Sequence, residues 1–197
     1  MDKKKILEAL ASAGVVRFGE FTLVSGDKSP IYVDMRILPS YPKEFDTITS
    51  ALADEAKDKG TEILCGMETA GIPLAAAMAV KAKLPMVYIR KKPKDYGTKS
   101  RIEGIIGEGK KALLVDDLIT RGTSKLSFID PVKDSGAELI GAIVILDREQ
   151  GGEDVMMEKG VSLYKLVTLK ELLSYMLEKK LMTEKQYEEV MQYLSSN

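Results

Sequence analysis

Short runs of apolar residues alternate with longer amphipathic segments through the middle of this 197-residue chain. Four of the runs are rich in β-branched residues and too short to require a helix: 62–66, 86–89, 112–115 and 139–146. Runs of this kind predict strands that are buried on both faces of a parallel sheet. Helical periodicity is found over 41–59, 72–83 and 123–135. The alternation of strand and helix predicts an open α/β sheet.

The flanking segments add smaller elements to this core. The N-terminal part predicts a helix over 3–13 that Gly14 stops, followed by a strand pair near 21–23 and 31–34. The C-terminal part predicts a strand over 162–168, a helix over 169–180 and a last helix after Thr183, which forms a capping-box pattern with Gln186. Pro131 is expected to kink or shorten the helix that contains it.

We expect one domain over the whole chain. Its three parts are an N-terminal hood segment (1–40), a core (41–150) and a C-terminal strand with helices (151–197). At 45% hydrophobic and 30% charged residues, a chain of this length can bury a sizeable core, so disorder is not expected.

Composition removes several classes of protein. The chain has no histidine and one cysteine, Cys65. Imidazole-based triads, zinc sites of the usual histidine or cysteine type and disulfide frameworks are therefore excluded within one chain, and a cytoplasmic location is expected. No stretch approaches the roughly 20 apolar residues of a membrane span, so no membrane partner is expected. Any catalysis by this chain must therefore use carboxylates, lysines, backbone amides or a metal that the ligand carries.

Positive charge is concentrated in one segment, although the whole chain has a formal net charge of only −1. Residues 81–101 carry eight basic side chains and one acidic one. Such a segment suits an anionic ligand. Beyond Tyr88 and Tyr96 it lacks the interleaved aromatic residues of a nucleic-acid-binding surface, and the slight overall excess of acidic residues also argues against nucleic acid as a partner.

The segment LLVDDLITRGTS at 113–124 contains most of the candidate chemistry. An apolar strand ends in two carboxylates, Asp116 and Asp117, and a turn with Gly122 then opens into a helix. Hydroxyl groups follow at Thr120, Thr123 and Ser124. Backbone N–H groups and hydroxyls in this arrangement suit a phosphate monoester, while the carboxylates suit sugar hydroxyls or a nearby divalent cation. The alternative is an acid pair that only caps the helix.

The string VDDLITRGTS at 115–124 resembles the binding motif for 5-phospho-α-D-ribosyl 1-diphosphate (PRPP) in type I phosphoribosyltransferases. Three further segments narrow the resemblance to orotate phosphoribosyltransferases: FTLVSGDKSPIYVD at 21–34, GMETAGIPLAAAMA at 66–79 and IRKKPKDYGTKSRIEG at 89–104. They are similar to the family's substrate segment, diphosphate-side loop and mobile catalytic lid. The resemblance implies the type I phosphoribosyltransferase fold, a mainly parallel central sheet flanked by helices, with a small hood from both chain ends.

The resemblance also implies an activity and its residues. The enzyme would be a pentosyltransferase that moves the ribosyl phosphate of PRPP onto orotate, giving orotidine 5′-monophosphate and diphosphate in pyrimidine synthesis. Catalysis is assigned to Lys94 and Asp117. PRPP binding is assigned to Arg90, Lys91, Lys94, Tyr96, Asp116, Asp117, Leu118, Ile119, Thr120, Arg121, Gly122, Thr123 and Ser124. Orotate binding is assigned to Thr120, Arg148 and Lys28.

Further implications concern the cofactor and the partner subunit. The family uses Mg²⁺ held mainly through PRPP and diphosphate, so no residue is assigned as a metal ligand. The family forms a homodimer in which the lid segment of one subunit, here residues 92–103, closes over the active site of its partner, and this gives Lys91 a role in trans. Several residues differ from those common in bacterial members of the family: Val24, Thr69, Ala70 and Tyr96.

Arg148 can form a bidentate fork with the orotate carboxylate, which a lysine would reproduce poorly. The alternative for Arg148 is a strand-end residue paired with Asp147 or Glu149. At the level of function, a type I phosphoribosyltransferase for a purine or xanthine remains open, as does a PRPP-sensing regulator. The lid lysines favour catalysis, and the short N-terminal helix leaves no room for an added DNA-binding helix pair.

Overall fold

The computed structural model describes residues 2–22, 26, 28–93 and 100–195, and within them the centre of the fold is a six-stranded sheet. The strand order is β5-β4-β3-β6-β7-β8, and neighbouring strands are parallel except β4 and β5. The strands are β3 (Ile63–Met67), β4 (Met86–Ile89), β5 (Ile102–Glu103), β6 (Lys111–Ile119), β7 (Glu138–Asp147) and β8 (Leu163–Thr168). The predicted α/β sheet is confirmed, and β5 adds an antiparallel edge strand that the sequence pattern did not indicate.

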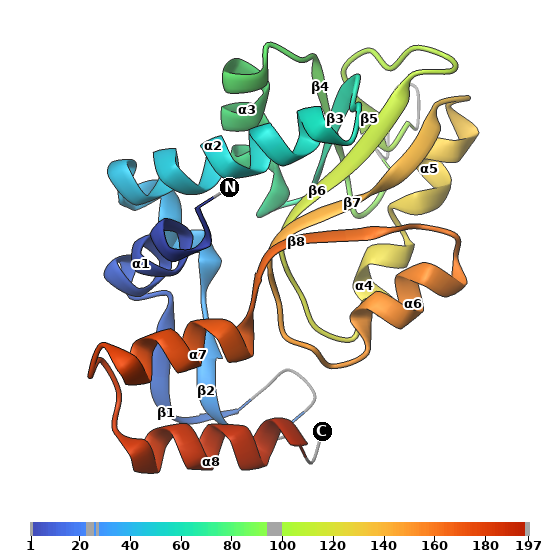
Figure 1. Cartoon of the computed structure of the whole chain (residues 1–197). Coiled ribbons are helices and arrows are strands. Elements are labelled where there is room, and N and C mark those ends of the chain that lie inside the picture. Colours follow the sequence, from blue (N-terminus) through green and yellow to red (C-terminus); the bar gives the residue numbers. More distant parts are fainter. Residues whose placement is uncertain (1, 23–25, 27, 94–99, 196–197) are drawn as a thin grey trace.

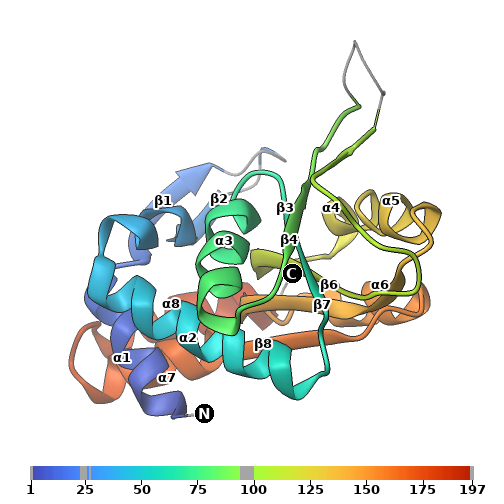
Figure 2. The same cartoon turned by 90° about the horizontal axis from the view of Figure 1, so that it is seen from above.

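Helices cover both faces of this sheet (Figures 1 and 2). One group comprises α1 (Lys3–Ala13), α2 (Pro42–Asp58) and α3 (Gly71–Ala82), and the other comprises α4 (Thr123–Leu126), α5 (Ile129–Asp134) and α6 (Gly152–Glu158). Successive strand residues point to opposite faces. Leu113 and Val115 of β6 therefore join the core beneath the first group, while Ala112 and Leu114 join the core beneath the second.

A smaller layer, the hood, is built from both ends of the chain. The hood strands β1 (Val16–Thr22) and β2 (Lys28–Val33) are antiparallel, and the 3-10 helix η1 (Met35–Ser40) follows them. Figure 1 shows α7 (Leu169–Glu178) and α8 (Glu184–Ser195) beside this hairpin. Val190 of α8 is 1% exposed, so α8 is packed into the same core. No helix in the described part of the chain is long and apolar enough to cross a membrane.

Several local sequence signals are confirmed. Gly14 ends α1 with a φ of 67°, a left-handed conformation that glycine adopts without the penalty of a Cβ. The N–H of Gln186 donates to Thr183 Oγ1, and the N–H of Thr183 donates to Gln186 Oε1, which completes the capping box. Cys65 is fully buried in β3, and burial raises the pKa of its thiol to about 12, so this cysteine has only a packing role.

The prediction of one helix over 123–135 is wrong, because the segment divides into α4 and α5 with a junction at Ser127 and Phe128. Pro131 lies in the first turn of α5, where a backbone N–H would have no acceptor within the helix, so proline is tolerated. Helix α6 has only seven residues, too few for a clear helical period in the sequence. The first hood strand begins at Val16 rather than near residue 21.

Helix α3 approaches the central strand closely because its first residue is Gly71. A Cβ added to Gly71 would lie 2.1 Å from the carbonyl oxygen of Val115 and 3.3 Å from the Cα of Asp116. No pair of such atoms tolerates the shorter distance, so only glycine allows this packing. The N-terminus of α3 is thereby placed against the point of β6 where the acid pair begins.

We predict that Gly71→Ala lowers the free energy of unfolding by about 1–3 kcal/mol, because the methyl group must displace α3 or β6. Urea unfolding of the purified protein measures this change. Gly107→Ala is the matched control, since a Cβ there meets the flexible Lys110 side chain, with its Cγ 3.1 Å away. The control should cost less than about 0.5 kcal/mol. Equal losses in the two variants would contradict the packing argument.

Candidate active site

The acid pair lies within β6 near its carboxyl end, because the strand continues past both aspartates. Asp116 is 7% exposed and forms a buried ion pair with Lys125 of α4. The second oxygen of Asp116 accepts a hydrogen bond from the N–H of Asp117 at 2.9 Å. The other residues of the predicted motif follow in order: Leu118 and Ile119 end β6, Thr120, Arg121 and Gly122 form a loop, and Thr123 and Ser124 begin α4.

Asp117 differs from its neighbour in its electrostatic environment. Burial, and after it the negative charge of Asp116, raise the pKa of Asp117 to about 6. The positive charge of Lys125 acts in the opposite direction, but its ammonium group is held by Asp116. Because Lys125 neutralises Asp116, Asp117 is the carboxylate that remains available to a sugar hydroxyl or to a cation on a ligand.

These side chains border a cavity of about 270 Å³ that extends to the residues before the lid segment. The cavity brings together four residues predicted to bind PRPP: Lys91, Asp116, Asp117 and Ser124. Three further lining residues, Glu68, Thr69 and Ala70, come from the segment predicted to be the diphosphate-side loop. The remaining lining residues were not predicted as ligand contacts: Arg36, Lys125 and Phe128. Lys125 could have been predicted from the sequence, since it directly follows the motif at 115–124. Arg36 comes from η1, and no spacing in the sequence connects it with the acid pair.

The loop at 120–122 is supported from outside by α6. Gly122 has a φ of 74°, and a Cβ added to it would lie 2.9 Å from the carbonyl oxygen of Gly152. A Cβ added to Gly152 would lie 2.5 Å from the carbonyl oxygen of Thr120. The two glycines therefore let α6 contact the loop backbone. Helix α4 has only four residues, so its dipole is small, and the loop N–H groups and hydroxyls are the main donors that this region offers to an anion.

Arg90 and Lys91 follow β4 and are held at the edge of the cavity through their backbones. The N–H of Lys91 donates to Glu68 Oε2 at 2.6 Å. The N–H of Arg90 donates to the carbonyl oxygen of Arg101 at 2.8 Å. The Arg90 guanidinium is half-buried, with Nη1 3.6 Å from a carboxylate oxygen of Glu103. Among the described residues, Lys91 is thus the predicted lid-side cation that lines the cavity, and it lines the cavity of its own chain although the resemblance implied a role in trans. Arg90 is not among the lining residues.

Arg148 directly follows β7, next to the loop that follows β6. Its N–H donates to the carbonyl oxygen of Ile119 at 3.0 Å, which ties the ends of the two strands together. The acids considered as alternative partners are engaged elsewhere, Asp147 with Lys165 at 2.8 Å and Glu149 with Lys170 at 3.7 Å. The structure therefore does not show the strand-end ion pair that was the alternative for Arg148.

The guanidinium of Arg148 is largely buried, and burial lowers its pKa while Tyr193 of α8 acts in the opposite direction. Among the described residues, Nε and Nη2 of Arg148 have no hydrogen-bond partner. A guanidinium stays protonated in proteins, so a buried one without acceptors is a strong candidate to bind an anion.

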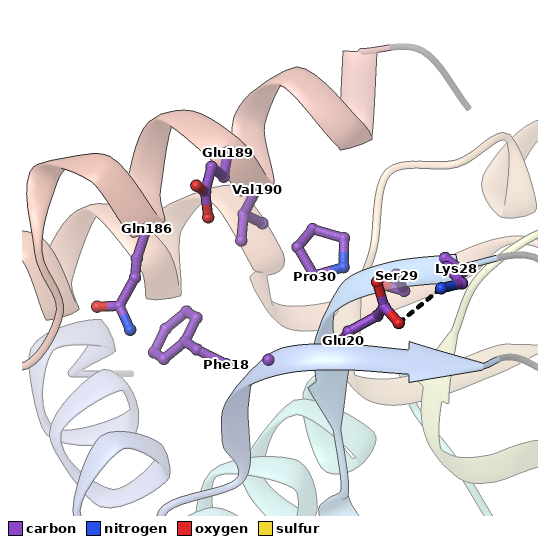
Figure 3. A pocket seen from close by; sticks show the side chains of 9 residues that line it. Phe18, Glu20, Lys28, Ser29, Pro30, Gln186, Glu189 and Val190 are labelled. Carbon is purple, nitrogen blue, oxygen red and sulfur yellow. Dashed lines mark hydrogen bonds and ion pairs between the residues drawn. The ribbon is translucent and has the colours of Figure 1, made fainter.

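Lys28 lies in a different hollow, of about 470 Å³, between the hood hairpin and α8 (Figure 3). Its ammonium group pairs with Glu20 at 2.6 Å, and both side chains are mostly exposed. No contact among the described residues connects Lys28 with Arg148 or the acid pair. Its orotate role therefore stays a prediction. Three other residues singled out from the sequence lie outside the described residues: Val24, Lys94 and Tyr96.

Comparison with known proteins identifies the class of this site. Residues 38–164 match the family model described as the phosphoribosyl transferase domain. This stretch contains the acid pair, the loop at 120–122 and Arg148. The chain therefore belongs to the phosphoribosyltransferase family.

Within this family, the chain belongs with the orotate phosphoribosyltransferases. The protein of that name from Methanocaldococcus jannaschii is 38% identical over 175 residues, which cover 88% of this chain and 99% of that protein. The structure of Leishmania donovani UMP synthase matches with a TM-score of 0.89 at 28% identity and covers 100% of this chain, which spans only 43% of that longer one. Orotate phosphoribosyltransferase from Mycobacterium tuberculosis, solved in complex with PRPP, matches with a TM-score of 0.72 at 25% identity, covering 87% of this chain and 99% of that chain.

We predict that Asp117→Asn stabilises the ligand-free fold above the pKa of Asp117. The folded-state pKa of about 6 exceeds the ordinary aspartate value, so the folded chain binds an extra proton between roughly pH 4 and 6. Wild-type stability is therefore lost as the pH rises through this range, and asparagine avoids that loss. The variant should gain roughly 1–3 kcal/mol of unfolding free energy at about pH 8, and the gain should vanish towards pH 4.

Urea unfolding at both pH values, with a chelator present, measures this difference. Asp54→Asn, on the exposed side of α2, is the control for loss of one negative charge. A gain in Asp117→Asn that is the same at both pH values would show that packing, not ionisation, is responsible.

Proposed function

We propose that the chain transfers the ribosyl phosphate of PRPP to N1 of orotate, producing orotidine 5′-monophosphate and diphosphate. The observation that carries this proposal is the buried Arg148 guanidinium, two of whose nitrogens have no acceptor among the described residues. Its fork of donors fits the orotate carboxylate, which uracil lacks. Thr120 and Lys28 are proposed as further orotate contacts. Membership in the family supports the same reaction.

PRPP would occupy the cavity and the loop at 120–122, the region that contains the predicted binding residues. The loop N–H groups and the hydroxyls of Thr120, Thr123 and Ser124 would hold the 5′-phosphate. The diphosphate would extend towards Lys91 and Arg36, cations that line the cavity. Arg36 is oriented by Asp34, which accepts from its Nε at 2.8 Å.

The reaction requires positive charge near the leaving group more than a strong base. When the bond between the anomeric carbon and diphosphate breaks, negative charge grows on the diphosphate and positive charge on the ribose ring. Lys91 and Arg36 would stabilise the first charge, and the carboxylate of Asp117 the second. The N1 proton of orotate is already acidic by amide standards, so a chain without histidine can support this chemistry.

Magnesium fits the site as a cation carried mainly by PRPP. In the described part of the chain, no three acidic, cysteine or histidine side chains lie close enough together to hold a metal ion. Asp117 offers one carboxylate, while Asp116 is engaged by Lys125. When bound, Mg²⁺ would neutralise diphosphate oxygens and make diphosphate a better leaving group. Asp117 would orient the ribose end of PRPP.

The lid segment of one subunit would serve the site of its partner in a homodimer. In this arrangement Lys94 adds positive charge to the diphosphate, and Tyr96 contacts PRPP. The composition of helix α3 is an argument for a partner subunit, because this helix is apolar on nearly all sides and yet Val80 is 80% exposed. A helix of this composition is ordinarily covered, and a second copy of the chain would cover it.

The match over 38–164 and the hood formed by both chain ends support a single phosphoribosyltransferase domain. Its proposed parts remain the hood segment at 1–40, the core at 41–150 and the C-terminal elements at 151–197. The proposed compartment is the cytoplasm, since the single cysteine is a buried free thiol.

The direct test mixes the protein with PRPP, Mg²⁺ and orotate and follows the orotate absorbance. We expect a PRPP-dependent decrease and the appearance of orotidine 5′-monophosphate by chromatography. Uracil, adenine or xanthine in place of orotate should give no nucleotide. A folded protein that consumes a purine and leaves orotate unchanged would overturn the proposed substrate.

Arg148→Gln should raise the KM for orotate by roughly tenfold or more, because a charge-assisted bidentate hydrogen bond contributes about 1.5–3 kcal/mol to the binding free energy. The affinity for PRPP, measured by titration calorimetry, should change by less than about threefold, since this contact concerns only the base. Arg17→Gln, on the exposed side of β1, is the control for loss of a guanidinium. An unchanged KM for orotate in a folded variant would contradict the proposed bidentate contact between Arg148 and the orotate carboxylate.

A further inference from the structure

Arg101 joins the chain before and after the segment that contains Lys94. The N–H of Arg90 donates to the carbonyl oxygen of Arg101 at 2.8 Å. In return, Nε of the Arg101 side chain donates to the carbonyl oxygen of Arg90, also at 2.8 Å. One residue therefore holds the peptide groups on both sides of Arg90. The pairing of Ile89 with Ile102 in β4 and β5 continues this contact into the sheet.

The same guanidinium reaches the junction between α4 and α5. Its Nη1 donates to the carbonyl oxygen of Ser127 at 2.7 Å, and its central carbon lies 5.6 Å from the centroid of the Phe128 ring. Ser127 caps the C-terminus of α4, about one turn after Ser124, the last residue of the motif at 115–124. Phe128 is 3% exposed and lines the cavity together with Lys91.

Arg101 differs in its side-chain contacts from the other described cations of residues 81–101. It is one of eight basic side chains between residues 81 and 101, but its Nε and Nη1 point to protein carbonyl oxygens. Arginine suits this arrangement, because its rigid fork can bond two acceptors while its flat face lies over an aromatic ring. A lysine offers one ammonium group, which cannot occupy both donor positions at once.

We propose that Arg101 is a positioning residue for the phosphoribosyl transfer. It holds Arg90, and through it Lys91, at a fixed place relative to the acid pair by tying the ends of the Lys94 segment to the α4–α5 junction. It has no contact with substrate in this role. The inference rests on the proposed function, because the cations that it positions are those assigned to the diphosphate.

Steady-state kinetics of Arg101→Gln and Arg101→Lys test this role. Arg101→Gln should lower kcat roughly 10- to 100-fold and raise the KM for PRPP, because small displacements of catalytic groups have effects of this size. The KM for orotate should stay within about twofold, since Arg148 is on another strand. Arg101→Lys should recover part of kcat, since it keeps one of the two bonds. Lys83→Gln is the matched control, because it removes an exposed charge from the same basic run of residues 81–101 but lies outside the lid, and its kcat should stay within about twofold.

Amide hydrogen exchange gives a readout that does not depend on turnover. In Arg101→Gln, exchange should accelerate in peptides that contain Arg90, Lys91 and Ile102, and the rest of the sheet should exchange as in the wild type. If kcat is unchanged, or if the exchange increases evenly over the chain, the positioning role is wrong. If the wild type forms no orotidine 5′-monophosphate, the proposed function fails, while exchange confined to these peptides would still support the contact itself.

Discussion

The buried ion pair between Asp116 and Lys125 organises the site. Both residues are nearly inaccessible, 7% and 9% exposed, so removing either one would leave the other as an unpaired charge in the interior. The pair joins the central strand to the helix after the phosphate loop. It also makes the two aspartates differ: Lys125 is paired with the carboxylate of Asp116, whereas the carboxylate of Asp117 remains available to a ligand. The raised pKa of Asp117 is a consequence of the same burial, so the ligand-free site retains an unfavourable charge that a bound cation or sugar could relieve.

Close backbone packing fixes this part of β6 from both faces of the sheet. Gly71 allows α3 to contact the strand at Val115, and Gly152 allows α6 to contact the loop at Thr120. The N–H of Arg148 adds a bond to the end of the strand at Ile119. A loop held in this way can present its N–H groups to a phosphate with little rearrangement, which is the condition for electrostatic stabilisation without reorganisation.

The sheet and the phosphate loop were predictable from sequence because both depend on local patterns. The continuous apolar run before Asp116 and Asp117 is typical of a strand buried on both faces, and the following Thr and Gly residues belong to a contiguous motif. Arg36 and Phe128 could not be predicted, since they reach the cavity only through the packing of η1 and of the α4–α5 junction. The sequence also could not show that Nε and Nη2 of Arg148 have no hydrogen-bond partner among the described residues. That state depends on Lys165, from the neighbouring strand, engaging Asp147.

The absence of histidine acquires a physical meaning in this arrangement. Guanidinium groups such as those of Arg36 and Arg148 keep their charge at any pH at which the fold survives. In the proposed reaction, the stabilisation of the leaving diphosphate by Arg36 and the recognition of the orotate carboxylate by Arg148 therefore need no titrating group. Sensitivity to pH near neutrality is left to Asp117, whose pKa of about 6 lies where an unperturbed histidine would titrate. A carboxylate in this position differs from an imidazole in one respect: its charged form is negative, which suits the positive charge that would develop on the ribose ring in the proposed reaction.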